Sequence, residues 1–136
     1  QGVDRVFDHT AAGYLDEIRE ASGGKIDVIL EMLANVNLQK DSELVSMFGR
    51  VVVIGNRGSL EFTPRAMMTK DATVFGMSLF NTPREQMDQI HAEIFIGLKQ
   101  GFLQPVIGRS YAIADAAPAH HAVIEDKAFG KIVLIP

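Results

Sequence analysis

Two short polar segments of the chain combine residue types that suit a nucleotide. Residues 31–37 contain Asn35 and Asn37, and the second segment is Gly55-Asn56-Arg57-Gly58. An arginine can bind phosphate oxygens through two N–H groups, asparagine can donate to and accept from a carboxamide or a ribose, and glycine lets backbone approach a ligand closely. A simpler interpretation also stands, in which residues 55–58 form only a tight turn and Asn37 caps the helix after it.

Both segments come directly after predicted strands. Short, continuous, β-branched apolar runs indicate strands covered on both faces, and they occupy residues 26–30, 50–54 and 131–135. Helix-compatible spacing appears at residues 37–47 and again before Gly23-Gly24. This alternation predicts an α/β fold with a doubly wound parallel sheet and flanking helices. Ligands of such sheets bind at the carboxyl ends of the strands, where these polar segments lie.

The clearest predicted helix begins at Thr82-Pro83-Arg84-Glu85. This motif supplies an N-cap hydroxyl, a proline at the first helical position and the glutamate of a capping box. The helix should extend to about Gln100, with Gly101 as its left-handed stop. Its apolar stripe is assigned to the core rather than to a cofactor pocket, and consists of Met87, Ile90, Ile94 and Leu98.

The remaining elements complete one predicted domain. A short helix begins near Thr63-Pro64, a strand spans residues 72–80, and a helix spans about residues 115–124. Residues 103–114 contain a proline and a glycine and are predicted to be extended and irregular.

Composition narrows the class of protein. The 136 residues carry a net charge of −4 without a basic stripe, which argues against nucleic acid as a partner. There is no cysteine, which suits a reducing compartment such as the cytoplasm. No apolar run approaches the roughly 20 residues of a membrane span, and residues 1–8 lack the layout of a signal peptide. We therefore expect a soluble cytoplasmic protein.

Other candidate sites are weaker. His120 and His121 are adjacent in a predicted helix, point about 100° apart and cannot chelate one metal from one face. No other spacing suggests a metal site, and no serine lies in a nucleophile-elbow motif. Met67-Met68 is interpreted as a pair of packing residues.

In their context, the polar segments resemble a known family, the zeta-crystallin type of quinone oxidoreductase. This family is a zinc-free branch of the medium-chain dehydrogenase/reductase superfamily. The resemblance covers essentially the whole chain, in order and with matching spacing. It is carried by Met32-Leu33-Ala34-Asn35-Val36-Asn37-Leu38, Gly49-Arg50-Val51-Val52-Val53-Ile54-Gly55-Asn56-Arg57-Gly58, Met77-Ser78-Leu79-Phe80, Pro105-Val106-Ile107-Gly108 and Gly130-Lys131-Ile132-Val133-Leu134.

The resemblance implies NADPH-dependent one-electron reduction of quinones, with a Rossmann-type cofactor domain and a separate GroES-type substrate domain. By matching position, the implied cofactor contacts are His9, Asn37, Ile54, Gly55, Asn56, Arg57, Met77, Ser78 and Leu79. In that picture His9 and Arg57 lie within reach of negative groups. Asn37 and residues 77–79 lie nearer the nicotinamide.

The chain lacks parts of the sequence pattern that the resembling family has. No segment matches the G-x-G-x-x-G turn that places a pyrophosphate at a helix N-terminus. We therefore predict that residues 1–136 are the carboxyl-terminal part of a partial, Rossmann-like nucleotide-binding domain, with residues 103–114 returning toward an absent amino-terminal catalytic domain. The chain alone should bind NADPH weakly or not at all, and catalysis by it alone is not expected.

Two predicted strands should also have exposed edges, because the strands that would pair with them are not in these 136 residues. Predicted strands at residues 5–8 and 28–30 would present unpaired backbone groups. In the resembling superfamily, the strand matching residues 72–80 pairs with its counterpart across a dimer axis. We therefore expect a homo-oligomer formed through exposed strand edges.

Two other functions stay open at this point. The chain could be a non-catalytic structural or interaction protein, as the crystallin resemblance suggests. It could also complete a cofactor site with another chain that supplies the glycine-rich turn.

Overall fold

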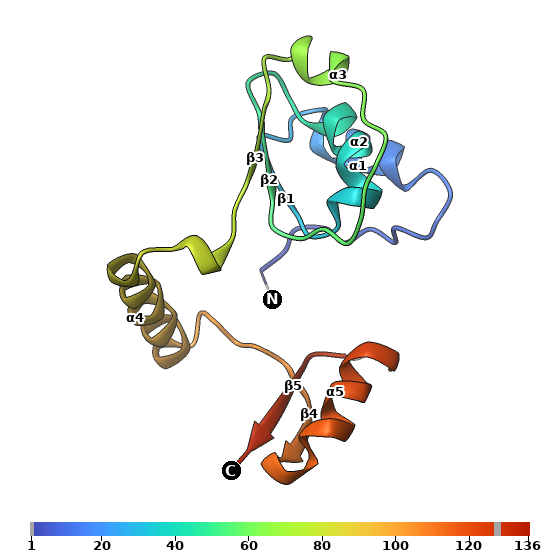
Figure 1. Cartoon of the computed structure of the whole chain (residues 1–136). Coiled ribbons are helices and arrows are strands. Elements are labelled where there is room, and N and C mark those ends of the chain that lie inside the picture. The colour runs from blue at the N-terminus through green and yellow to red at the C-terminus, as the bar shows by residue number, and fades with distance from the viewer. Residues whose placement is uncertain (1, 127–128) are drawn as a thin grey trace. The chain divides into compact units, whose positions relative to one another are not determined.

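The computed structural model describes residues 2–126 and 129–136. Residue 1 and residues 127–128 lie outside the described part of the chain. The described chain forms two compact units, residues 2–82 and residues 83–136 (Figure 1). No helix among the described residues is both long and apolar enough to cross a membrane.

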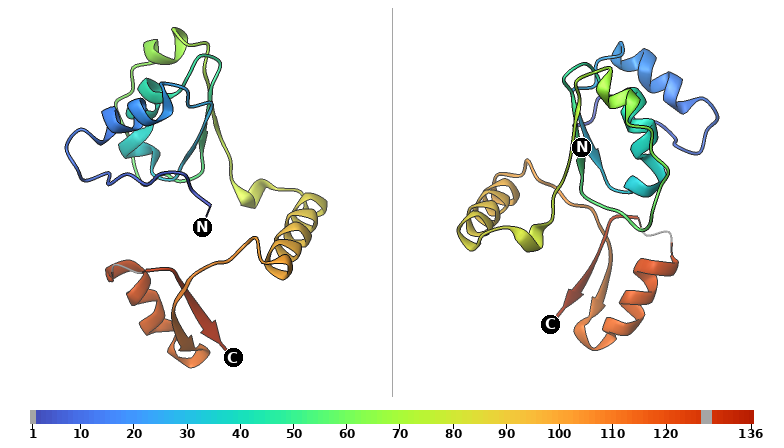
Figure 2. Two further views of the ribbon diagram at one scale, coloured as in Figure 1. Left: turned by 180° about the vertical axis from the view of Figure 1, so that it is seen from behind. Right: turned by 45° about the horizontal axis from the view of Figure 1, so that its top comes forward.

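The amino-terminal unit is a parallel sheet flanked by helices. Strands β1 (Val28–Glu31), β2 (Arg50–Val53) and β3 (Thr73–Gly76) pair in that order, and each pair is parallel. Helices α1 (Tyr14–Ser22), α2 (Ala34–Leu44) and α3 (Arg65–Met68) lie on the same side of this sheet (Figures 1 and 2). The predicted α/β class, with parallel strands and flanking helices, is confirmed.

One side of the sheet carries the core of this unit. Val45, Val51 and Met67 form a buried cluster, against which Ile29 and Leu38 also pack. Because side chains alternate along a strand, the residues next to Ile29 and Val51 point to the other side.

That other side is exposed. Leu30 pairs with Val52, which pairs with Phe75, and Leu30 and Phe75 are 65% and 45% exposed. The prediction that these strands are covered on both faces is therefore wrong for this unit. A continuous apolar run shows that both faces can be buried, but the helices between the strands cover only one of them.

Helix α2 begins earlier than the predicted helix. Its N-cap is Leu33, so Asn37 lies inside the helix and the interpretation of Asn37 as a cap is wrong. At the other end, the Lys70 ammonium donates hydrogen bonds to the carbonyl oxygens of Ser42 and Glu43, at 2.9 and 2.7 Å. These contacts satisfy carbonyl groups that have no partner within the helix, which explains why it stops at Leu44 rather than at residue 47.

Two other strand predictions for this unit need correction. Residues 5–8 form no strand, since no described strand pairs with them. The predicted strand at 72–80 is shorter, because β3 ends at Gly76 and Leu79–Asn81 forms the single-turn helix η1. The short helix near residue 64 is confirmed as α3, in which Met67 is buried and Met68 is 73% exposed. Only one of the two methionines is thus a packing residue.

The carboxyl-terminal unit begins with helix α4 (Arg84–Gln100), which ends at the left-handed Gly101 as predicted. The predicted capping box does not form: Pro83 is extended and is itself the N-cap, with no side-chain cap bond. The apolar stripe of α4 is partly exposed, with Ile94 at 44% and Leu98 at 47%, so its assignment to the core is wrong for this unit.

The rest of this unit is a second, smaller parallel sheet. Strand β4 (Ile107–Ala112) pairs with β5 (Lys131–Ile135), and helix α5 (Ala116–Glu125) follows the short helix η2 (Ile113–Asp115) and packs on both strands. The predicted helix near 115–124 and the last strand are confirmed. The prediction of an irregular segment at 103–114 is wrong for β4, because pairing with β5 orders its backbone.

Candidate functional site

The two polar segments found in the sequence lie side by side after β1 and β2. The Ala34 N–H donates to the Gly55 carbonyl at 2.9 Å, and the Ile54 N–H donates to the Glu31 carbonyl at 2.8 Å. The Arg57 N–H donates to the Asn35 side-chain oxygen at 2.9 Å. Backbone and side-chain bonds therefore hold the two turns together at the carboxyl end of the sheet.

Gly55 is a glycine because of this contact between turns. A Cβ atom at Gly55 would overlap the carbonyl oxygen of Met32, whereas a Cβ at Gly58 would meet only the Asn35 amide nitrogen, at 3.8 Å. Glycine was predicted to let backbone approach a ligand. The close approach that the structure shows at Gly55 is to the chain's own backbone.

A shallow pocket opens where β2 and β3 end. It has a volume of about 360 Å³ and is lined by Val53, Ile54, Gly55, Asn56, Gly76, Met77, Ser78 and Asn81. Five of these residues belong to the predicted set of cofactor contacts, from two segments that lie far apart in the sequence. The pocket thus stands at the place where ligands of parallel sheets bind.

The other predicted contacts lie outside this lining. The Asn37 amide nitrogen donates to the Glu31 carboxylate at 3.3 Å, the Arg57 side chain is exposed, and Leu79 is 53% exposed in η1. His9 lies in an exposed turn before α1. No hydrogen bond or ion pair within residues 2–126 and 129–136 joins His9 to the pocket.

The turn that contains His9 is held by its neighbours. The Asp8 carboxylate accepts hydrogen bonds from the Thr10 N–H and hydroxyl, at 2.9 and 2.6 Å. These bonds stabilise the ionised form and lower the pKa of Asp8.

Two polar residues at this end of the sheet were missed by reasoning from the sequence. Glu31 is the last residue of β1 and is only 5% exposed, and Asn81 lines the pocket. A polar residue at the end of an apolar run was the available signal for Glu31. No comparable signal identified Asn81, since its place depends on the short helix η1.

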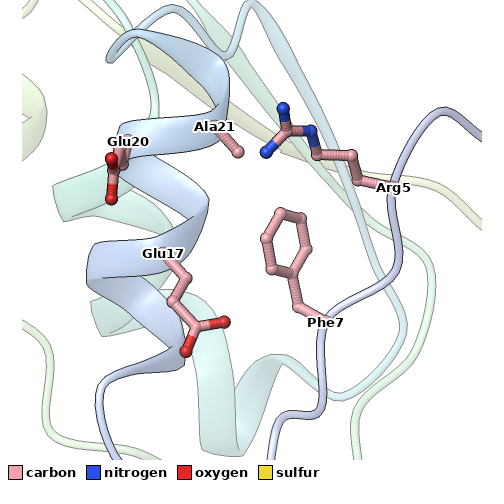
Figure 3. Close-up of a pocket in the computed structure, with 5 residues that line it drawn as sticks. All are labelled: Arg5, Phe7, Glu17, Glu20 and Ala21. Carbon is pink, nitrogen blue, oxygen red and sulfur yellow. The ribbon is translucent and has the colours of Figure 1, made fainter.

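A second cavity lies between the amino-terminal segment and α1. It has a volume of about 390 Å³ and is lined by Arg5, Phe7, Glu17, Glu20 and Ala21. Figure 3 shows the Phe7 ring directed toward α1 and the Arg5 guanidinium directed toward Ala21. This cavity is not at the strand ends and contains none of the predicted contacts, so the pocket after β2 and β3 is the better candidate.

Comparison with known proteins agrees with the resemblance seen in the sequence. The human quinone oxidoreductase is 43% identical over 136 residues, which cover 98% of this chain and 41% of that protein. Pig and rat quinone oxidoreductases match at 43% and 42% identity over the same length. The chain therefore spans about 41% of the length of these curated relatives, and the resemblance to quinone oxidoreductases is confirmed.

Solved structures show the same fold. An NAD-dependent alcohol dehydrogenase superposes with a TM-score of 0.83 at 19% identity, covering 99% of this chain and 38% of that one. A mycobacterial protein complexed with NADPH superposes with a TM-score of 0.79 at 21% identity, covering 99% and 43%. The sequence profile described as zinc-binding dehydrogenase matches residues 1–134. With nearly the whole chain matched, the protein belongs to the zinc-binding dehydrogenase family.

Proposed function

We propose that this chain is the carboxyl-terminal part of an NADPH-dependent quinone oxidoreductase and that it contributes contacts to the nicotinamide and ribose side of the cofactor. The observation that carries the proposal is the pocket after β2 and β3, where Ile54, Asn56 and Met77 come together. The quinone oxidoreductase relatives support the activity, and the NADPH complexes among the structural neighbours support the cofactor.

The residues of this pocket fit a nicotinamide nucleotide. Backbone groups of residues 54–56 and 76–78 and the amides of Asn56 and Asn81 line a space that could accept a carboxamide and a ribose. The exposed guanidinium of Arg57 is next to this lining in the chain and can bind a phosphate group. When bound, NADPH supplies the reducing equivalents for the quinone.

The histidine, aspartate and glutamate side chains in the described part of the chain do not provide a set of ligands for a zinc ion, although the family is described as zinc-binding. The sequence has no cysteine, and in residues 2–126 and 129–136 no three histidine, aspartate or glutamate side chains gather to hold a metal. We therefore propose that the chain belongs to a zinc-free branch, and we assign no step to a metal. The absence of cysteine also supports our proposal of a cytoplasmic location.

Filling the pocket should weaken cofactor binding without unfolding the chain. Gly76 lines the pocket and a Cβ there would meet no atom within 4 Å, so we expect a valine side chain to be accepted and to occupy pocket space. With the chain labelled by ¹⁵N, NADPH at millimolar concentration should shift the amide signals of residues 54–57 and 76–81. In Gly76→Val these shifts should fall at least about fivefold, which corresponds to about 1 kcal/mol of binding free energy.

The control is Thr73→Val, which adds valine to the same strand outside the pocket lining. It should leave the NADPH-induced shifts unchanged. Shifts confined to the cavity near Arg5 and Phe7 would contradict the proposed cofactor contacts.

We also propose that the chain forms a homo-oligomer through a strand edge. Within the part of the chain that the structure describes, the order β1-β2-β3 leaves β3 paired on one side only. The N–H groups of Thr73 and Met77 donate to Gly49 and Val53 beside β2, so the alternate N–H groups of Val74 and Gly76 point to the open edge. An unpaired edge of this kind can join a second strand.

Light scattering after size-exclusion chromatography should therefore give about twice the chain mass of 14.9 kDa. Val74→Pro removes one outward N–H group without removing a bond to β2, and it should produce a monomer. A folded wild-type monomer at high concentration would show that the edge does not mediate association.

A further inference from the structure

A buried group of acids lies beneath the turn that follows β1. Glu31 ends β1 and Asp41 lies on α2, and these two side chains are 5% and 6% exposed. Asn37 lies one turn before Asp41 on the same helix, where it is half-buried. None of the three lines the pocket after β2 and β3.

Both hydrogen bonds that the Glu31 side chain accepts from described N–H groups end on the same carboxylate oxygen. One oxygen of its carboxylate accepts the Leu33 N–H and, at 3.3 Å, the amide nitrogen of Asn37. A carboxylate can only accept, so it selects the nitrogen of the Asn37 amide and leaves the amide oxygen on the side away from Glu31.

Asp41 supplies the second observation. Its Oδ2 atom is buried and has no hydrogen-bond partner within the described part of the chain. The Glu31 side chain is within hydrogen-bonding reach of Asp41, two buried carboxylates so placed repel each other, and a buried polar atom without a partner is costly. A proton between Asp41 and Glu31 removes both penalties, because it neutralises one charge and supplies the missing hydrogen bond.

We propose that Glu31 and Asp41 share one proton and that this pair is a positioning device, which holds the amide of Asn37 with its oxygen directed away from Glu31. The amide orientation stands on the contact between Glu31 and Asn37, and the shared proton stands on the burial of both acids and on the unpartnered Oδ2 atom of Asp41. A role of that oxygen as an acceptor for a ligand N–H or hydroxyl group rests on the proposed function.

The burial of Asp41 and the charges near it agree with a proton shared between Asp41 and Glu31. Burial is the main cause that raises the pKa of Asp41 to about 7, and the hydrogen bond and charge of Glu31 act in the same direction. Lys40, on the same helix, lowers that pKa. Helices α1 and α3 and strand β2 also pack on α2, and no charged group of theirs in the described chain shifts the pKa of Asp41.

The sign of the pH effect follows from the raised pKa. The folded chain binds this proton more tightly than the unfolded chain, so the stabilisation is complete below the ordinary value of 3.8 and is lost as the pH rises to about 7. Asp41→Asn keeps the shape of the protonated acid and cannot ionise. The melting temperature of the wild-type chain relative to this variant should therefore fall between pH 4 and pH 7 and stay constant above that range.

Carboxyl ¹³C signals of the wild-type chain test the shared proton directly. The Asp41 signal should titrate near pH 7, and the side-chain amide signals of Asn37 should shift with the same midpoint. Both effects should vanish in Asp41→Asn. Glu43→Gln, an exposed change on the same helix, should leave both midpoints in place. The proposal is overturned if Asp41 titrates near its ordinary value or if the Asn37 amide does not follow it.

Cofactor binding is measured separately, so the two proposals fail separately. If NADPH shifts only residues outside the pocket while Asn37 follows Asp41, the proposed function fails and the proton-sharing pair stands. If NADPH shifts the pocket residues while Asn37 is independent of Asp41, the positioning device fails and the proposed function stands.

Discussion

Replacing Gly55 by alanine is expected to destabilise the amino-terminal unit by about 3 kcal/mol, because the new methyl group would overlap the Met32 carbonyl oxygen. This overlap is with backbone, which cannot move aside as a flexible side chain can. The strand pairing and the bond from Ala34 N–H to the Gly55 carbonyl hold that backbone in place. Separating the two turns would also displace residues 54–56, which line the pocket.

Gly58→Ala is the matched control. The same methyl group there would lie 3.8 Å from the Asn35 amide, which is an ordinary contact, and the change should alter stability by less than about 0.5 kcal/mol. Urea unfolding followed by the amide signals of residues 2–82 compares the two variants. Equal midpoints for Gly55→Ala and Gly58→Ala would show that the turns are not held as closely as the structure indicates.

Val51→Ala is expected to cost about 2 to 3 kcal/mol of unfolding free energy. Val51 is fully buried between the sheet and the helices, where it packs with Val45, Met67 and Ile29. Losing two methyl groups there removes apolar contact and leaves a cavity, because strand pairing on both sides prevents β2 from moving inward.

Val52→Ala makes the same chemical change one residue along, on the open side of the sheet. Val52 is only partly buried, and its strand neighbours Leu30 and Phe75 are exposed, so the expected loss is below about 1 kcal/mol. The same urea titration measures both variants. A larger loss for Val52→Ala than for Val51→Ala would mean that the exposed side of this sheet is covered in solution.

The order of strands and helices could be predicted from the sequence because it depends on local pattern. The apolar runs at β1, β2 and β5 and the glycine after α4 are local signals, and the structure contains each of these elements. The failures concern partners that lie far away in the sequence. Residues 5–8 have strand-like composition but no neighbour with which to pair, and β4 is ordered only by a strand that comes about twenty residues later.

In the candidate site, too, the residues marked by a local signal were predicted and those that depend on distant partners were not. Residues 54–56 and 77–78 were found because each follows a strand, and the pocket brings them together. Their assignment as cofactor contacts stays a prediction. The acid pair was not predicted, since nothing local distinguishes Glu31 and Asp41 from exposed carboxylates until β1 and α2 are packed. The start of α2 was misplaced because its N-cap is Leu33, whose apolar side chain makes no capping bond and so gives no signal in the sequence.

The strand order β1-β2-β3 has a consequence for how the protein is made. Among the described residues, β2 pairs with β1 and β3 pairs with β2, so these three strands can pair one at a time in the order of synthesis. Both pairings lie within residues 2–82. These three strands can thus pair with one another while the rest of the chain is still being translated, which shortens the time for which the edges between them are exposed to aggregation.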